Sequence, residues 1–213
     1  MTISKLHYSS QGSTPEDHLI NIQKACTYGI ELVQLHLKDV SKAHYLEIAK
    51  AARDITLRYQ TRLVITNNYE VAKAVKAEGV ILENLEVCPT QIRPHLYSWQ
   101  MIGGIANTLE DCKAFLAKDV DYITLGPFTS TYENTSSNTL SLNSYNAINK
   151  ALHTEKPIIA FGTIAPNDVT ALIEAGVAGI AVADGITTNF DTIKRFNQLL
   201  QASATGEIRH TFE

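Results

Sequence analysis

The sequence has few cysteines, and those it has do not form a recognisable group. Its 213 residues include three cysteines, Cys26, Cys88 and Cys112, which lie far apart in the chain. An odd number of separated cysteines argues against a disulfide framework or a Cys-x-x-Cys metal site and is typical of a reducing compartment. We therefore expect a cytoplasmic protein that folds without disulfides.

The sequence also lacks a cluster of basic residues and a long apolar run. Its 18 Lys and Arg are outnumbered by 22 Asp and Glu, so the formal net charge is −4, and nothing favours nucleic-acid binding. No apolar segment approaches the roughly 20 residues of a membrane span, and the opening MTISKLHYSSQG has no apolar signal core. We expect no nucleic-acid or membrane partner. The oligomeric state stays open, with a homo-oligomer among the expectations.

Short β-branched runs alternate with helical patterns along the chain. The composition, 45% hydrophobic and 19% charged, is typical of a soluble globular domain. A chain of this length can bury roughly 70% of its unfolded surface, so one full core is expected. The strand candidates are 6–10, 32–38, 62–67, 79–84, 100–107, 121–127, 157–164 and 178–186. The clearest helical stretches are 18–29, 44–60, 108–120 and 169–177, and the weakest is 89–96.

This alternation predicts a single (β/α)8 TIM barrel, an α/β fold, over residues 1–204, followed by a polar tail at 205–213. Runs that are apolar on both faces are typical of parallel strands buried between a core and an outer layer. A doubly wound sheet is the alternative, but it usually has a glycine-rich first turn, and the first turn here, SSQGSTPEDH, has one glycine. The barrel is therefore favoured, and its site should lie at the carboxyl ends of the strands.

The second strand carries three polar side chains on one face. Residues two apart on a strand share a face, so Gln34, His36 and Lys38 should point together into the barrel mouth. There they would offer an amide, an imidazole and an ammonium to an anionic ligand. An exposed strand face is the alternative, but a parallel barrel strand meets solvent only at its end. The other histidines, His7, His18, His44, His95, His153 and His210, are interpreted as surface or helix-face residues.

Small and hydroxyl-bearing residues follow the last three strands. A buried run at 121–125 meets Gly126-Pro127 and is followed by about a dozen residues rich in Ser, Thr and Asn. The turns FGTIAPND (161–168) and ADGITTN (183–189) would let backbone N–H groups approach a phosphate. The alternatives are a solvated connection and tight turns that need glycine for their backbone angles. The candidate ligand-binding residues here are Thr129, Ser130, Thr131, Gly162, Thr163, Asp184 and Gly185.

Motifs along nearly the whole chain resemble thiamine-phosphate synthases and their thiazole-tautomerase relatives. They are LHYSSQGSTPEDHL, VQLHLKDV, LVITNN, GVILENLE, MIGGIANTLEDC, DYITLGPF, IIAFGTIAPNDV and GIAVADGI. The resemblance implies a transferase that joins hydroxymethylpyrimidine diphosphate to thiazole phosphate with loss of Mg²⁺-bound pyrophosphate, so small phosphorylated substrates and Mg²⁺ are expected. It assigns catalytic roles to Gln34, His36, Lys38 and Asn67, and metal binding to Asn68 and Glu86.

Several positions depart from the family pattern. His36 stands in place of an arginine, Asn68 in place of a metal-binding aspartate, and Asn134 near the place of a loop lysine. Ile105 replaces a small hydroxyl residue, and Asn107 stands about where the tautomerases have a histidine. An imidazole is only partly charged at neutral pH and does not reproduce the bidentate fork of an arginine. Two hypotheses follow: a divergent synthase, or a non-catalytic barrel that binds a thiamine precursor or another phosphorylated ligand.

Overall fold

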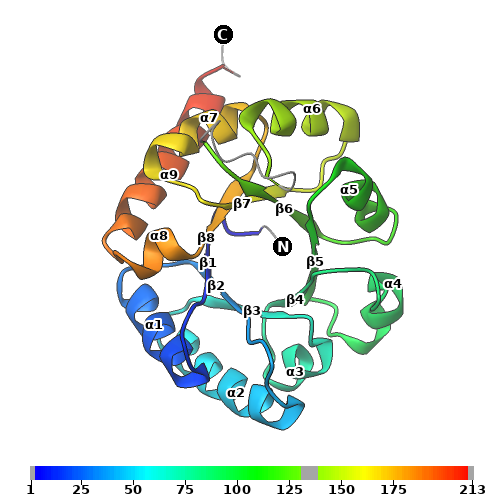
Figure 1. Ribbon diagram of the computed structural model, residues 1–213, viewed down its shortest axis with the longest axis vertical. Coiled ribbons are helices and arrows are strands. Elements are labelled where there is room, and N and C mark those ends of the chain that lie inside the picture. Colours follow the sequence, from blue (N-terminus) through cyan, green and yellow to red (C-terminus); the bar gives the residue numbers. More distant parts are fainter. Residues whose placement is uncertain (1–2, 131–138, 211–213) are drawn as a thin grey trace.

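A computed structural model shows a closed barrel of eight parallel strands and describes residues 3–130 and 139–210. The strands pair in chain order, and β8 closes the barrel by pairing with β1. Figure 1 shows the helices arranged around the outside of this barrel. The predicted (β/α)8 fold is therefore confirmed. The strands are β1 (Leu6–Ser9), β2 (Leu32–Leu35), β3 (Arg62–Thr66), β4 (Gly79–Leu82), β5 (Met101–Ala106), β6 (Tyr122–Phe128), β7 (Ile158–Gly162) and β8 (Gly179–Val182).

The helices differ widely in length. They are α1 (Pro15–Thr27), α2 (Lys42–Arg58), α3 (Tyr69–Ala74), α4 (Pro89–Ile92), η1 (Arg93–His95), α5 (Leu109–Leu116), α6 (Leu142–Leu152), η3 (Pro166–Asp168), α7 (Val169–Glu174), α8 (Asp184–Thr187) and α9 (Thr192–His210). The weak helical pattern at 89–96 becomes two short turns, α4 and η1. Since α9 continues to His210, residues 205–210 of the expected tail are helical.

Hydroxyl side chains cap the starts of three barrel helices, α1, α2 and α5. The hydroxyls of Thr14 and Thr108 each accept a hydrogen bond from the backbone N–H of an aspartate in the first turn of α1 and α5. The side chain of the same aspartate accepts from the backbone N–H of the capping threonine. Ser41 caps α2 in the simpler way. Such caps satisfy backbone donors that have no partner within the helix. They set the point at which each connection turns away from the barrel mouth.

The sixth strand passes through a proline. The predicted run 121–127 includes Gly126-Pro127, and β6 continues to Phe128, which pairs with Gly162 of β7 across an irregular register. A proline lacks an N–H, yet it is tolerated where a bulge already interrupts the ladder. The register shift between Leu125 and Phe128 is such an interruption. The predicted strand at 121–127 is therefore confirmed as β6, which ends one residue later at Phe128.

Apolar side chains form two layers, one inside the barrel and one between the strands and the helices. The outer layer contains residues such as Val33, Leu35, Leu63 and Ile65, all fully buried. The inner layer consists of Ile3, Leu32, Val64, Ile81, Met101, Tyr122, Ile159 and Ala181. Strand residues alternate between these layers because successive side chains point to opposite faces. The inner layer fills the barrel, and the polar residues His7 and Gln34 are buried beside it.

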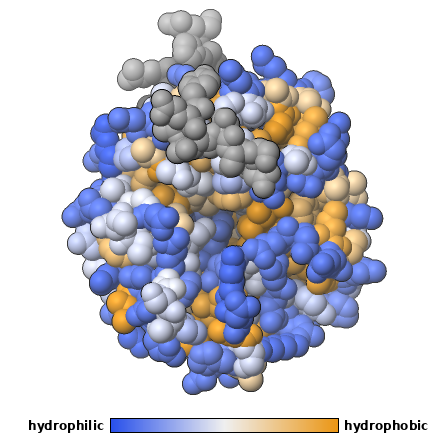
Figure 2. Space-filling view, viewed as in Figure 1, coloured by the Kyte–Doolittle hydropathy of each residue, from blue (hydrophilic) through white to orange (hydrophobic). Residues whose placement is uncertain are grey.

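Hydrophilic residues cover much of the face seen in Figure 2, with smaller apolar patches between them. Among the residues that the structure describes, no helix combines the length and apolar character needed to cross a bilayer.

Candidate ligand site at the barrel mouth

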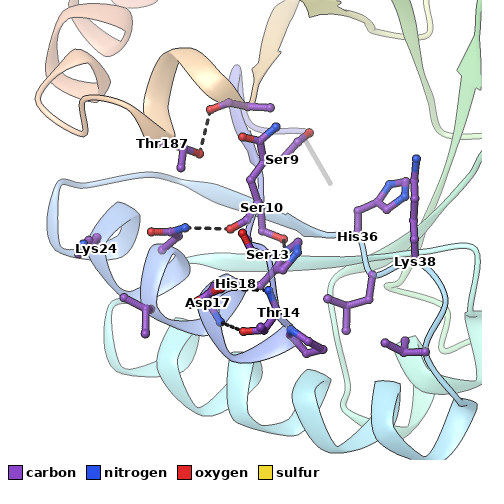
Figure 3. Close-up of a pocket in the computed structure, with 18 residues that line it drawn as sticks. Ser9, Ser10, Ser13, Thr14, Asp17, His18, Lys24, His36, Lys38 and Thr187 are labelled. Carbon is purple, nitrogen blue, oxygen red and sulfur yellow. Dashed lines mark hydrogen bonds between the residues drawn. The ribbon is translucent and has the colours of Figure 1, made fainter.

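Two adjoining cavities lie at the carboxyl ends of the strands. The larger, about 970 Å³, is bounded by the β1–α1 connection, α1, the residues after β2, and two residues at the ends of α8, Ala183 before it and Thr187 at its end. The smaller, about 390 Å³, is bounded by the residues that follow β2, β3 and β4. His36, Leu37 and Lys38 line both cavities. The segment after β2 is therefore common to the two cavities, and Figure 3 shows His36 and Lys38 of this segment beside the larger one.

The structure divides the three polar residues of the second strand between two roles. Gln34 lies within β2 and is 4% exposed, and it points into the barrel as expected. Its Oε1 accepts a hydrogen bond from Ser9 at 2.9 Å, and its Nε2 lies 2.9 Å from Nδ1 of His7. His36 and Lys38 lie beyond the end of the strand and face the cavities, where Lys38 is exposed. The amide of Gln34 is thus occupied inside the barrel, while His36 and Lys38 can meet a ligand.

The interpretation of His7 as a surface histidine is wrong. His7 is fully buried inside the barrel, and its Nε2 lies 2.8 Å from the carbonyl oxygen of Ser4. Burial lowers the pKa of His7 to about 4; its hydrogen bond to Ser4 opposes that effect and the charge of Arg62 adds to it. The alternation in LHYSS could have predicted that His7 points into the barrel, since His7 and Ser9 share one strand face and Leu6 and Tyr8 share the other.

An acidic residue that was not assigned a role, Glu83, lines the smaller cavity. Asn67, held in a left-handed conformation with φ of 59°, donates from its side-chain amide to Oε2 of Glu83 and accepts from the Glu83 backbone N–H at 2.9 Å. The other carboxylate oxygen of Glu83 lies 3.6 Å from Nδ1 of His36. Asn67 therefore positions Glu83 beside His36. Glu83 follows β4 directly, so it lies at one of the strand ends where the sequence predicts the site.

His36 sits in a mixed electrostatic environment. Burial lowers the pKa of its imidazole, the Glu83 carboxylate raises it, and the Lys38 ammonium lowers it again. The net direction is downward, so His36 is mainly neutral at neutral pH. It can donate or accept a hydrogen bond at the cavity wall, but it carries little of the positive charge of the arginine that the family pattern has there.

The two residues expected to bind metal are placed differently. Asn68 lines the smaller cavity, and its Oδ1 accepts from the Val71 N–H at 3.1 Å as the cap of α3. Glu86 is exposed and is not among the residues that line either cavity. Within residues 3–130 and 139–210, no group of three or more His, Cys, Asp or Glu side chains is arranged to hold a metal ion.

The turn after β7 needs a glycine for structural reasons. Gly162 has φ of 136°, and a Cβ added there would lie 2.3 Å from the backbone nitrogen of Phe128. Thr163 is exposed, and its N–H donates to the Phe128 carbonyl at 3.1 Å. The close approach of β6 and β7 therefore accounts for Gly162 by itself, and the Thr163 N–H is used within the turn.

The remaining candidate phosphate-binding residues lie outside the walls of the two cavities. Thr129 donates its backbone N–H to Leu140, and Ser130 is exposed. Asp184 and Gly185 are exposed at the start of α8, where the Asp184 carbonyl accepts from Thr188. Thr131 lies outside the described residues, as does Asn134.

These observations define the class of protein. An all-parallel (β/α)8 barrel places hydroxyl, imidazole, ammonium and carboxylate groups around polar cavities at the carboxyl ends of its strands, which is the arrangement of barrels that bind or transform small polar molecules.

Comparison with known proteins identifies the family. Residues 8–186 match the family described as thiamine monophosphate synthase. The thiamine-phosphate synthase of Flavobacterium psychrophilum is 34% identical over 201 residues, covering 92% of this chain and 97% of that one. That of Flavobacterium johnsoniae is 33% identical, covering 94% and 98%. A Pyrococcus furiosus thiamine phosphate pyrophosphorylase has the same fold, with a TM-score of 0.80 at 21% identity over 93% of this chain and 96% of that one. The chain belongs to the thiamine monophosphate synthase family.

Proposed function

We propose that this protein is a thiamine-phosphate synthase with an altered pyrophosphate site. It would join hydroxymethylpyrimidine diphosphate to thiazole phosphate and release pyrophosphate. The observation that carries this proposal is the convergence on one cavity at the barrel mouth of four residues at the family's catalytic and metal-binding positions: Lys38, Asn67 and the two substituted positions His36 and Asn68. The proposal includes a cytoplasmic location. It also includes self-association into a homo-oligomer, which sedimentation of the purified protein tests.

The reaction breaks the bond between the pyrimidine methylene carbon and a pyrophosphate oxygen, and the thiazole nitrogen then bonds to that carbon. Negative charge therefore develops on the leaving pyrophosphate, and positive groups near it accelerate the step. Lys38 is exposed at the cavity wall and forms no ion pair within the described part of the chain. We assign the leaving pyrophosphate to Lys38, with a hydrogen bond from His36.

The smaller cavity offers few protein ligands for Mg²⁺, so substrate oxygens would have to supply the others. Mg²⁺ prefers oxygen and is commonly held by one or two carboxylates together with substrate phosphates. The Glu83 carboxylate and the Asn68 side-chain oxygen offer such atoms at the smaller cavity, and Glu86 stays part of the proposal as a second carboxylate. The bound ion would neutralise part of the negative charge of the pyrophosphate group. Asn67 contributes by holding Glu83 in place.

A specific observation favours the second candidate, a barrel that binds a phosphorylated ligand without turnover. The amide of Gln34 is occupied inside the barrel, His36 is mainly neutral, and Glu83 brings a negative charge into the smaller cavity. Each of these features weakens the attraction for a pyrophosphate group relative to a site with arginine. In this candidate, Lys38 binds the ligand but no bond is broken.

The test is thiamine-phosphate formation from the two phosphorylated precursors by purified protein with Mg²⁺. The key variant is Lys38→Ala, and the matched control is Lys50→Ala, which removes an exposed lysine on α2. Turnover that is lost in Lys38→Ala and kept in Lys50→Ala supports the synthase. No turnover by folded protein that still binds the thiazole phosphate supports the second candidate. The combined restoration His36→Arg, Asn68→Asp and Asn134→Lys should then create activity in that protein.

A further inference from the structure

A chain of hydrogen bonds runs through the inside of the barrel and ends at the wall of the larger cavity. The carbonyl oxygen of Ser4 lies 2.8 Å from Nε2 of His7, and Nδ1 of His7 lies 2.9 Å from Nε2 of Gln34. Oε1 of Gln34 lies 2.9 Å from the hydroxyl of Ser9. Ser4, His7 and Gln34 are buried, whereas Ser9 is half-buried and lines the larger cavity.

The direction of each bond follows from its first member. A carbonyl oxygen only accepts, so Nε2 of His7 must carry the hydrogen that faces Ser4. In the neutral ring Nδ1 then has a lone pair and accepts from the NH₂ of Gln34. This turns the oxygen of Gln34 toward Ser9, and because that oxygen only accepts, Ser9 must donate to it. The single hydrogen of the Ser9 hydroxyl is thus used inside the barrel.

Reversing the chain requires a charged histidine. If the Gln34 amide flipped, its oxygen would face Nδ1 of His7, and both ring nitrogens would have to carry hydrogens. His7 is fully buried, and the charged group that acts on it is Arg62, which has the same sign. With the pKa at about 4, the charged ring is roughly 1,000-fold rarer than the neutral ring at pH 7.

We propose that Ser9 is a specificity-determining residue, which the buried His7–Gln34 pair holds as a hydrogen-bond acceptor at the wall of the larger cavity. A ligand group that lies against Ser9 must therefore donate, as an amine does. Phosphate oxygens and other pure acceptors are disfavoured there, so the phosphate groups of a ligand lie elsewhere, toward Lys38.

The proposed function supplies a ligand of this kind, and the identity of the ligand rests on it. The pyrimidine substrate of thiamine-phosphate synthesis carries an exocyclic amino group, which donates, and its diphosphate cannot donate once ionised. We assign that amino group to Ser9. His7 and Gln34 act only through Ser9, so both are positioning residues.

The experiment measures the affinity of two probes by calorimetry: 4-amino-5-hydroxymethyl-2-methylpyrimidine, and the analogue with a methyl group in place of the amine. We expect the wild-type protein to prefer the amine by about fivefold, the size of one ordinary hydrogen bond. Ser9→Ala should abolish the preference. Ser98→Ala, the same change at an exposed position before β5, should keep it.

Gln34→Met tests the positioning role. The methionine is close in size to glutamine, but its sulfur accepts only weakly, so the Ser9 hydroxyl is released to donate into the cavity. The ratio of the two affinities should then fall to about twofold or less, whereas a purely structural role of Gln34 would lower both affinities together and keep their ratio. Nitrogen-15 chemical shifts of His7 test the origin of the chain: a hydrogen on Nε2 alone is expected, and a hydrogen on Nδ1 overturns the inference.

The other outcomes are also decisive. Equal affinity for the two probes in the wild-type protein, or no binding of either, overturns the inference about Ser9. A preference for the amine in a protein that forms no thiamine phosphate supports the inference and refutes only the synthase reaction. A preference that survives Ser9→Ala assigns recognition of the amine to another residue and overturns the proposal.

Discussion

Acid should destabilise this barrel through one buried imidazole, His7. The ring is fully buried, and its pKa falls from the ordinary value of 6.5 to about 4, mainly because burial disfavours the charged form. Between those two pH values the unfolded chain binds a proton at His7 and the folded chain does not. Stability therefore falls as the pH falls from 6.5 toward 4 and levels off below that range.

The size of the effect follows from the difference between the two pKa values. A change from 6.5 to about 4 corresponds to about 3 kcal/mol of unfolding free energy contributed by this one residue. That is a large part of the 5–15 kcal/mol typical of a domain. Other groups titrate in the same range, so the contribution of His7 must be measured as a difference.

The assay is urea unfolding, followed by circular dichroism, of the wild-type protein and His7→Gln from pH 7.5 to pH 4. At pH 7 the variant should be less stable than the wild-type protein, because both ring nitrogens of His7 have hydrogen-bond partners that a glutamine does not meet in the same geometry. The gap between the two proteins should narrow by about 3 kcal/mol as the pH falls. His95→Gln, which removes an exposed histidine, should leave the pH dependence of the wild-type protein almost unchanged. Parallel stability curves for wild type and His7→Gln would refute the reasoning.

Three further changes test other parts of the structure. Glu78→Ala should lower the unfolding free energy by about 3–5 kcal/mol in urea unfolding. It leaves Arg53 of α2 without a carboxylate and the backbone N–H of Leu63 without its acceptor. A loss below about 1 kcal/mol would contradict this. Gly103→Ala should lower the unfolding free energy by about 1–3 kcal/mol, because the added Cβ would lie 2.3 Å from the ring of Tyr122. A melting temperature equal to that of the wild-type protein would show that the ring moves aside and would contradict this. Glu83→Gln should lower the pKa of His36 further, since the carboxylate raises it, and an NMR titration that moves upward would contradict the pairing.

The sequence predicted the barrel because its signals are local. Each strand is a short β-branched run, each main helix has a periodic apolar face, and cap residues such as Thr14, Ser41 and Thr108 stand where α1, α2 and α5 begin. Eight such units in a chain of this length leave few alternatives to closure into a barrel. The strand passes through Gly126-Pro127 with an irregular pairing to β7, and because that pairing is not local, the sequence does not show it.

The sequence also located the mouth, since polar side chains follow the strands at their carboxyl ends. Strand alternation was enough to point Gln34 inward and to bring His36 and Lys38 to the mouth. It was also enough to place His7 and Ser9 on a shared face, although their burial was not recognised. What these residues can do chemically depends on their partners, and those partners lie on other elements.

Only the tertiary structure decided the partners. The amide of Gln34 is used by a histidine and a serine on β1, far away in the chain, and Glu83 is held by Asn67 from the neighbouring connection. Such contacts depend on the register between neighbouring strands and on barrel closure, so no local pattern contains them. The sequence by itself determined the fold, the family resemblance and the end of the barrel where ligands bind. The protonation state of His7 and the placement of Glu83 between Asn67 and His36 required the assembled barrel, because burial and hydrogen-bond partners exist only there.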